Sequence, residues 1–339
     1  MPSRHMSSYD AQRAPRRRWV EAVVLTLACA ATAAGCFWFA YSGRLEAWLG
    51  SLGLMPIEQA RPAAQSPATQ DAQAQPRGLA SYTWAELSDI SRQIEAVGPA
   101  GAVAAAQHFG LANEDGSLSD ALREVTLADG SSFGVRLVGL LQDERADGSG
   151  PVGLSFLAAE CVAQRPMRAD GSAQGGWLAS DLRAWIAQEL VPALPGDLSQ
   201  CLVPVSKRVN AAGRVEDLAL VDEGLIGQSS ELVWVPSAVE VCGPVSWFGD
   251  AYGATHERMD ALVNAEGAQY QRFAQGGVTA AGDPGGLCVR AWQGVACGWW
   301  YRTPYALLSD AYYGALDSGY PAGTFEAGDA QGVVVGFCL

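Results

Sequence analysis

The chain has 339 residues, of which 49% are apolar, so it is long enough for about two domains and a sizeable core. Acidic residues outnumber basic ones by 36 to 22, which gives a formal net charge of −14. This balance argues against nucleic acid as a partner, because phosphate backbones are bound through clustered Lys and Arg. Lys207 is the single lysine, which we interpret as a habit of composition.

The uncharged segment AVVLTLACAATAAGCFWFAY, which ends at Tyr41, predicts a transmembrane helix over residues 19–41. At 1.5 Å per residue it spans about 30 Å, the thickness of the bilayer core. Trp19 lies at one end and Trp38 at the other, where interfacial aromatic residues are common. Residues 1–18 form a basic head with five arginines, which the positive-inside rule places in the cytoplasm. We therefore predict a single-pass protein of the cell membrane.

Three other interpretations of this segment are a cleaved signal peptide, a lipoprotein site and a buried core helix. The lipoprotein site would be AAGC, with Cys36 as the lipidated residue, but the apolar FWFAY that follows argues against it. A core helix is disfavoured because the segment is apolar all round. All three interpretations leave the conclusion nearly unchanged, namely that the bulk of the chain is exported.

Residues 42–80 predict a juxtamembrane segment and a stalk. Residues 42–58 are amphipathic, whereas residues 59–78 are rich in Ala, Pro and Gln and contain almost no large apolar side chain. Such a composition cannot bury enough surface to fold. We expect the extracellular folded domain at residues 81–339.

The folded domain is expected to open with a helix, because Thr83 and Glu86 match the capping box. Its apolar positions recur every three or four residues, as in an amphipathic helix: Trp84, Leu87, Ile90, Ile94 and Val97. A second short helix is expected at residues 101–109.

The pattern then changes to that of strands. Residues 123–127 and 132–141, joined by a turn at Asp129-Gly130, predict a β-hairpin, and residues 152–162 predict another strand. Short strand-like runs follow, separated by Gly and Pro: CLVPV, LALV, ELVWVP, GLCVRAW, GWWYRT, YYGALD and VVVGF. The expected fold class is α+β, strand-rich, with two main helices packed on one side.

One stretch in the middle of the chain, GGWLASDLRAWI, predicts a further helix. Ser180 is its expected N-cap and Asp181 lies in the first turn, where a negative charge suits the helix dipole. We expect the helix to end at Pro192. Its expected buried stripe consists of Leu182, Trp185, Ile186 and Leu190.

Aromatic side chains concentrate between Trp234 and Tyr313, where 13 occur in 80 residues. Exposed rings stack on sugar faces and anchor protein interfaces. The ligand-binding candidates are five rings in loop-like surroundings: Trp247, Phe248, Trp292, Tyr305 and Tyr312. The alternative is that most of these rings fill a core.

Six cysteines lie beyond the predicted span, and in an exported domain they predict up to three disulfides among 15 possible pairings. They are Cys161, Cys201, Cys242, Cys288, Cys297 and Cys338. No metal-ligand spacing occurs. Asp143 and Asp147, in DERADGSG, are weak candidates for calcium, and an acidic turn is the plainer interpretation. Motifs of the GxSxG, P-loop and HExxH types are missing, and His256 is interpreted as a solvated helical residue.

Several segments carry a resemblance in combination: TWAELSDIS, GGWLASDLRAWI, ELVWVPSAVEVCGPVSWF, EGAQY, and GWWYRTPYALL followed by GVVVGFCL. Over residues 81–339 they are similar to an uncharacterised bacterial family, the domain of unknown function six-two-seven-three. The resemblance implies an exported domain on membrane-anchored or cell-wall proteins. The last two segments also look like those of C-type-lectin-like folds, including the formylglycine-generating, sulfatase-modifying group.

The family has no assigned catalytic residues, so we expect its motifs to be structural. Arg183 is expected to pair with a carboxylate such as Glu231 or Glu240, and Arg302 to do the same. The signature residues are Trp177, Ser180, Arg183, Trp185, Trp300 and Arg302.

Three functions stay open. The first is a surface module that binds a glycan, a cell-wall component or a partner protein. The second is an enzyme of the sulfatase-modifying type, or a thiol redox protein using Cys288 and Cys297. The third is a structural surface protein, for which small residues in the span permit helix pairing: Ala30, Ala34 and Gly35.

Overall fold

The computed structural model describes residues 77–211 and 223–339. The predicted head, membrane helix and most of the stalk lie outside these residues, as does the run LALV. Within the described ranges, no helix has the length and apolar character needed to cross a bilayer.

The first of two five-stranded sheets has the order β1-β2-β3-β14-β7. Its strands are β1 (Arg123–Thr126), β2 (Ser132–Glu144), β3 (Pro151–Ala158), β14 (Gly336–Cys338) and β7 (Val233–Trp234), and neighbours run antiparallel. The predicted hairpin and the strand after it are confirmed as β1, β2 and β3. The last strand of the chain is thus inserted between β3 and β7.

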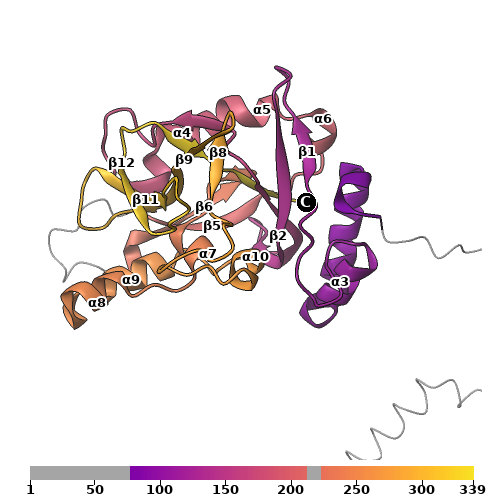
Figure 1. Cartoon of the computed structure of the whole chain (residues 1–339), viewed down its shortest axis with the longest axis horizontal. Coiled ribbons are helices and arrows are strands. Elements are labelled where there is room, and N and C mark those ends of the chain that lie inside the picture. The colour runs from indigo at the N-terminus through magenta and orange to yellow at the C-terminus, as the bar shows by residue number, and fades with distance from the viewer. Residues whose placement is uncertain (1–76, 212–222) are drawn as a thin grey trace, which may run out of the picture. The chain divides into compact units, whose positions relative to one another are not determined.

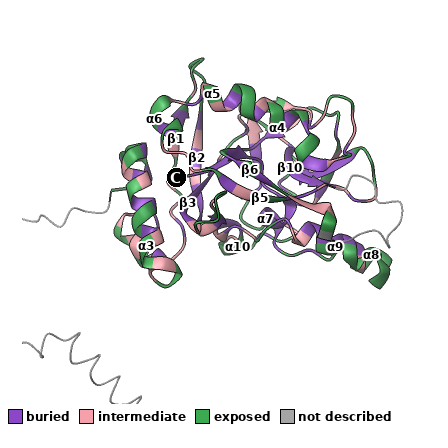
Figure 2. Ribbon diagram, turned by 180° about the vertical axis from the view of Figure 1, so that it is seen from behind, coloured by how far each residue is buried: buried purple, intermediate pink, exposed green. Residues whose placement is uncertain are grey.

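The second sheet has the order β12-β11-β10-β13-β4. Its strands are β12 (Gly323–Glu326), β11 (Ala311–Ala315), β10 (Trp299–Pro304), β13 (Gln331–Val333) and β4 (Ala163–Arg165). Only the β10–β13 pair is parallel. Because β13 and β14 are consecutive, the chain passes from the second sheet into the first just before its end, and every residue of β10 is buried (Figure 2).

Two hairpins complete the strands: β5 (Val205–Asn210) with β6 (Ile226–Glu231), and β8 (Arg290–Trp292) with β9 (Val295–Cys297). The mixed α+β class is therefore as predicted. The expectation of two main helices is wrong, because several short helices follow β7 (Figure 1). They are α7 (Ala238–Cys242), α8 (Trp247–Tyr252), α9 (Glu257–Asn264) and α10 (Gln271–Gln275).

Helix α3 (Trp84–His108) packs on β2 and β3 of the first sheet. Its capping box is present as predicted, with Thr83 and Glu86 bonding each other's backbone N–H. Four of the five predicted apolar positions are buried, but Val97 is 52% exposed. The reason is a kink at Gly98, whose φ of 66° is not helical, so the apolar face does not continue through Val97.

The helix of GGWLASDLRAWI ends at Ala193, one residue beyond the predicted end at Pro192. It runs from α4 (Asp181–Trp185) through a π-helical turn (Ile186–Leu190) into α5 (Val191–Ala193). Pro192 lies two residues after the end of the π-helical turn and one residue before the end of the helix. Ser180 is the N-cap, as predicted, and accepts a hydrogen bond from Arg183 N at 3.2 Å. A further short helix, α6 (Gly196–Ser199), follows.

The contact of α3 with β3 requires a glycine at position 153. A Cβ there would overlap the carbonyl oxygen of Ser91 and lie 2.7 Å from its carbonyl carbon. Ser91 is itself fixed, because its hydroxyl donates to the backbone carbonyl of Leu339 and accepts from Leu154 N at 3.2 Å.

We predict that Gly153→Ala lowers the free energy of unfolding by about 1–3 kcal/mol, measured by urea denaturation. Gly196→Ala, where a Cβ meets nothing within 4 Å, is the control and should change stability little.

Candidate functional site

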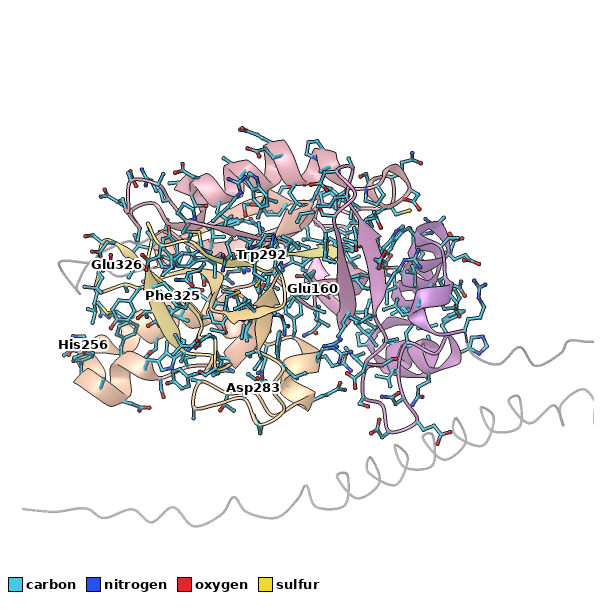
Figure 3. All side chains as sticks on the ribbon, turned by 45° about the horizontal axis from the view of Figure 1, so that its top comes forward. Glu160, His256, Asp283, Trp292, Phe325 and Glu326 are labelled. Carbon is cyan, nitrogen blue, oxygen red and sulfur yellow. The ribbon has the colours of Figure 1, made fainter. Side chains whose placement is uncertain are left out.

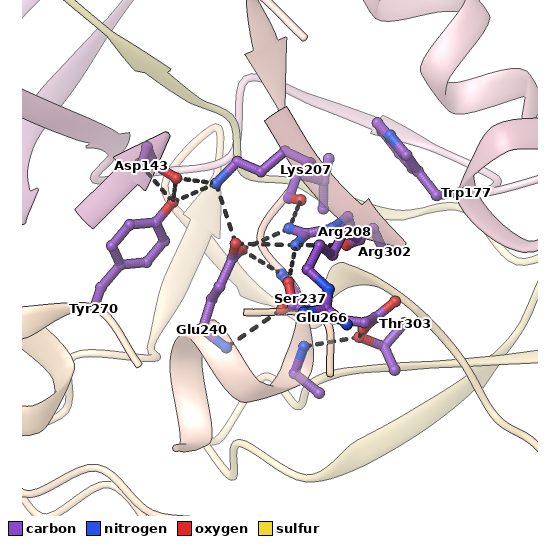
Figure 4. A network of polar contacts seen from close by, with 12 residues as sticks. Asp143, Trp177, Lys207, Arg208, Ser237, Glu240, Glu266, Tyr270, Arg302 and Thr303 are labelled. Carbon is purple, nitrogen blue, oxygen red and sulfur yellow. Dashed lines mark hydrogen bonds and ion pairs between the residues drawn. The ribbon is translucent and has the colours of Figure 1, made fainter. Parts of the chain in front are cut away.

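A pocket of about 350 Å³ opens where β2, β5 and β6 meet the segment that precedes α10. Its walls come from the end of β2 and the following turn (residues 142–148), from β5 (residues 206–208) and from residues 266–270. Its floor consists of the lining residues whose charged side chains are buried, Asp143, Lys207, Glu240 and Glu266, and Figure 4 shows the polar contacts among them. The pocket therefore joins solvent to a charge network inside the domain.

Lys207 is the centre of this network, and it is only 2% exposed. Its Nζ donates to Asp143 Oδ1, to the hydroxyl of Tyr270 at 2.7 Å and to Glu240 Oε1 at 3.1 Å. The Tyr270 hydroxyl in turn donates to Asp143 at 3.1 Å. The ring of Trp234 lies 4.1 Å from Nζ and adds a cation–π contact. The ammonium is thus enclosed by two carboxylates and two rings.

Arg302, on β10, forms a bidentate pair with Glu240 of α7. Its Nη1 lies 2.5 Å from Glu240 Oε2 and its Nη2 lies 2.9 Å from Oε1. Burial alone would raise the pKa of Glu240, but the charges of Arg302 and Lys207 outweigh it and lower that pKa to about 2. The backbone N–H of Ser237 donates to the same carboxylate at 2.9 Å. Glu240 therefore stays ionised and holds both cations.

Glu266 is the third buried carboxyl group, and it differs from Glu240. It accepts from Asn210 N at 2.7 Å and from the hydroxyl of Thr303, while Arg302 reaches only its backbone carbonyl, at 3.0 Å. Without a bidentate cation, burial dominates and raises the pKa of Glu266 to about 7. This group therefore changes charge near neutral pH.

The signature residues have the structural contacts expected of them. Arg183 Nε bonds Glu231 Oε1 at 2.6 Å, and Trp177 Nε1 donates to the same atom at 3.1 Å, so the predicted Arg183–Glu231 pair is confirmed. Arg302 also pairs with a carboxylate, as expected, and that carboxylate is Glu240. Trp300 is buried and donates to a backbone carbonyl. Trp185 is half-buried rather than fully in the core, with the guanidinium of Arg165 over its ring.

The five ligand-binding rings do not line the pocket. Phe248 and Tyr312 are 1% and 0% exposed, so the prediction that they lie in loops and face solvent is wrong. They belong to α8 and β11, where apolar rings fill the space between elements. Trp247 stacks on Tyr313 with ring centroids 4.4 Å apart.

The two remaining rings are half-buried. Tyr305 packs edge-on against Tyr313, and Trp292 is the last residue of strand β8 (Figure 3). His256 lies at the periphery, in the turn before α9, and contacts the hydroxyl of Thr255 (Figure 3).

The calcium candidates are used otherwise. Asp143 is buried and faces an ammonium group, and Asp147 closes its own turn by accepting from Ser149 N at 2.9 Å. Residues 77–211 and 223–339 contain no group of three or more side chains able to hold a metal ion. The calcium hypothesis for DERADGSG is therefore wrong with respect to Asp143.

The six cysteines expected to form disulfides are free thiols in this structure. Cys288 is fully buried, and burial raises the pKa of its thiol. Its expected redox partner, Cys297, has its sulfur 3.5 Å from that of Cys161 instead. A reactive thiol site built on Cys288 and Cys297 is thus not formed.

The network draws its residues from motifs that lie far apart in the sequence. ELVWVPSAVE supplies Glu240, EGAQY supplies Glu266 and Tyr270, and GWWYRTP supplies Arg302. The remaining two members are Asp143, expected only as a weak calcium candidate, and Lys207, for which no role was predicted. One feature of the sequence indicates a buried role for Lys207. The single lysine alternates with Val205 and Val209 in a strand-like run, so it shares their inward face.

Compared with protein-family models, with curated proteins and with solved structures, the chain matches none of them. The similarity to the uncharacterised bacterial family stays a prediction that rests on the quoted motifs.

Removal of the buried ammonium should be strongly destabilising. Lys207→Met leaves Asp143 buried without its cation, while Glu240 keeps only Arg302, so we expect a loss of about 3–5 kcal/mol in unfolding free energy. The double variant Lys207→Met/Asp143→Asn should lose less than the sum of its two single variants. Arg92→Met, which removes an exposed ion pair with Asp89, is the control and should cost under about 1 kcal/mol. Strict additivity of the two core substitutions in denaturant unfolding would contradict the network.

The raised pKa of Glu266 makes stability depend on pH. Between its ordinary value of 4.5 and about 7, the folded protein binds more protons than the unfolded chain. The free energy of unfolding should therefore fall as the pH rises through this window, by up to about 1.4 kcal/mol per pH unit. Glu266→Gln should abolish that fall, because it removes the titrating group. Glu240 contributes only at lower pH, since its pKa is about 2 and its effect is lost as the pH falls below 4.5.

The measurement is urea unfolding at intervals between about pH 5 and pH 7. Glu257→Gln, an exposed carboxylate on α9, serves as the matched control and should keep the slope. A wild-type stability that rises over this window, or an unchanged slope in Glu266→Gln, would contradict the assignment.

Proposed function

We propose that the domain is the recognition module of a membrane-anchored bacterial surface protein, and that its pocket binds a small polar ligand carrying both an amino and a carboxylate group. Such groups occur together on short peptides, including the peptide part of cell walls. The observation that carries the proposal is the solvent-open pocket floored by a fixed network of buried charges.

The floor favours recognition because it is already organised. Each buried charge is held by at least one opposite charge or hydrogen bond, so a ligand would meet groups that need no reordering. The volume of about 350 Å³ lies at the small end of the range for ligand sites, which suits a dipeptide or a single sugar.

Two charges of opposite sign remain at the rim. Arg208, on β5, and Glu144, at the end of β2, line the pocket, are exposed and have no ion-pair partner among the described residues. A ligand with one carboxylate and one amino group could pair with both. The pocket offers no exposed ring, since Tyr270 is 1% exposed, so stacking on a sugar face is not favoured there.

The enzyme alternative has less support. The buried thiols have raised pKa values, and the single lysine is held in ion pairs rather than presented as a free nucleophile. The assembly alternative depends on the predicted span, which lies outside the described residues.

The membrane anchor and the C-type-lectin-like arrangement remain parts of the proposal. The anchor is supported by the basic head and the apolar segment of residues 19–41. The arrangement is supported by the positions of the two strands that carry the resemblance: β10 is central in one sheet and β14 is internal in the other.

Titration calorimetry on the full chain in detergent tests the ligand class. We expect D-alanyl-D-alanine to bind, and its N-acetylated and C-amidated forms to bind about tenfold more weakly or worse, because each lacks one charged hydrogen bond. Arg208→Gln and Glu144→Gln should each weaken the unmodified dipeptide to a similar extent. Arg258→Gln, an exposed arginine on α9, is the matched control and should bind as the wild type does.

Glucosamine and N-acetylglucosamine extend the panel to sugars. Binding of both sugars with equal affinity, together with no effect of Arg208→Gln, would overturn the pocket as the ligand site. Saturation by none of the probes at millimolar concentration would overturn the proposed ligand class.

A further inference from the structure

Two cysteines far apart in the sequence are in contact. The Sγ atoms of Cys161 and Cys297 lie 3.5 Å apart, although 136 residues separate them. Cys161 lies in the connection between β3 and β4, and Cys297 is the last residue of β9. We propose that these two thiols are joined by a disulfide bond, which ties the β8–β9 hairpin to the β3–β4 connection.

The backbone fixes the two cysteines relative to each other. The N–H of Cys161 donates to the carbonyl oxygen of Ala291 at 3.0 Å, and Ala291 belongs to β8. The β8–β9 ladder then pairs Arg290 with Cys297. One hydrogen bond and one strand pair therefore link the cysteines, so the sulfur contact does not depend on two independent side-chain rotations.

The sequence also leaves room for the sulfur pair. Gly332, on β13, faces both sulfurs, and a Cβ there would overlap Cys161 Sγ and lie 3.1 Å from Cys297 Sγ. The backbone of Gly332 is held by its N–H, which donates to the carbonyl of Gly298 at 2.8 Å. A larger residue at 332 would occupy the space that the two sulfurs share.

The other described cysteines have different neighbours. Cys242 donates to the carbonyl oxygen of Pro321 at 3.2 Å. The Sγ of Cys338 lies 3.3 Å from the hydroxyl of Ser155 and 3.4 Å from Asp143 Oδ2. Cys288 is buried beside the indole of Trp299, which bonds its carbonyl, and Cys201 is half-buried near the end of α6. Of the 15 pairings that six cysteines allow, the structure thus favours one bond in particular.

The bond requires a disulfide oxidant, such as oxidised glutathione or the thiol oxidases outside the cytoplasm. Cys297 is the better entry point because it is half-buried, whereas Cys161 is 3% exposed. The Cys297 thiolate attacks oxidised glutathione, forming a mixed disulfide and releasing one glutathione thiolate. The Cys161 thiolate then attacks the Cys297 sulfur and releases the second. The protein loses two protons and two electrons, and one oxidised glutathione becomes two reduced ones.

Peptide mapping gives a direct test, because trypsin places each of the six cysteines in a separate peptide. Arg165 precedes a proline and resists cleavage, so Cys161 falls in residues 146–168 and Cys297 in residues 291–302. The full chain in detergent is equilibrated with an excess of oxidised over reduced glutathione. It is then blocked with N-ethylmaleimide under acidic, denaturing conditions and digested without reductant. We expect the joined pair 146–168 and 291–302, at a mass about 2 Da below the sum of the two reduced peptides.

The variants make the result specific. Cys297→Ser should leave the 146–168 peptide carrying N-ethylmaleimide, and Cys201→Ser, the matched control, should leave the joined pair unchanged. Gly332→Ala should lower its yield by displacing a sulfur. Recovery of both wild-type peptides with the blocking group after equilibration, or joined to peptides other than each other, would overturn the proposal. Peptide mapping detects only which cysteines are joined, so its result does not depend on whether the pocket binds a ligand.

Discussion

The fold depends on neutralising charges that it has taken out of water. Glu240 provides the key contact, because its two oxygens meet Arg302 in a bidentate pair while one of them also meets Lys207. An isolated buried ion would cost several kcal/mol, and only close pairing with saturated hydrogen bonding offsets that cost. Every element that supplies a member of the network must therefore hold its position to within a hydrogen-bond length.

The network joins parts of the chain that are not paired with one another by backbone hydrogen bonds. Asp143 comes from β2 of the first sheet, Arg302 from β10 of the second, and Lys207 from the β5–β6 hairpin, while α7 contributes Glu240 (Figure 4). The capping box of α7 uses the same Glu240 carboxylate to accept from Ser237 N. One side chain thus sets the start of a helix and the docking of two sheets.

The sequence was most informative where local rules decide the structure. The capping box at Thr83, the N-cap at Ser180 and the β1–β2 hairpin depend on neighbours within a few residues, and all three form as predicted. Arg183 pairs with Glu231, one of the two carboxylates proposed as its partner.

Long-range features were less accessible. The short helices α7–α10 are too brief for a periodic pattern, and the contact of Lys207 with Asp143 joins positions 64 residues apart. The aromatic cluster was ambiguous in principle, because the same residue types, Trp, Tyr and Phe, fill protein cores and bind sugars. Only packing distinguishes them, and it buries Phe248 and Tyr312.

The network lies beneath a pocket, and this position helps to explain why the domain has buried charges there. Buried ion pairs are poor sources of stability, and apolar residues of similar volume often replace them at no cost. A floor made for stability alone would be expected to be apolar, particularly in a chain that is 49% apolar. Here the pairing leaves carboxylate and ammonium groups next to solvent-accessible space, while Arg208 and Glu144 at the rim remain without an ion-pair partner among the described residues. A rigid charged floor with unpaired charges at the rim is what the proposed recognition of a charged ligand requires, because groups that are already held in place need no reordering when a ligand binds.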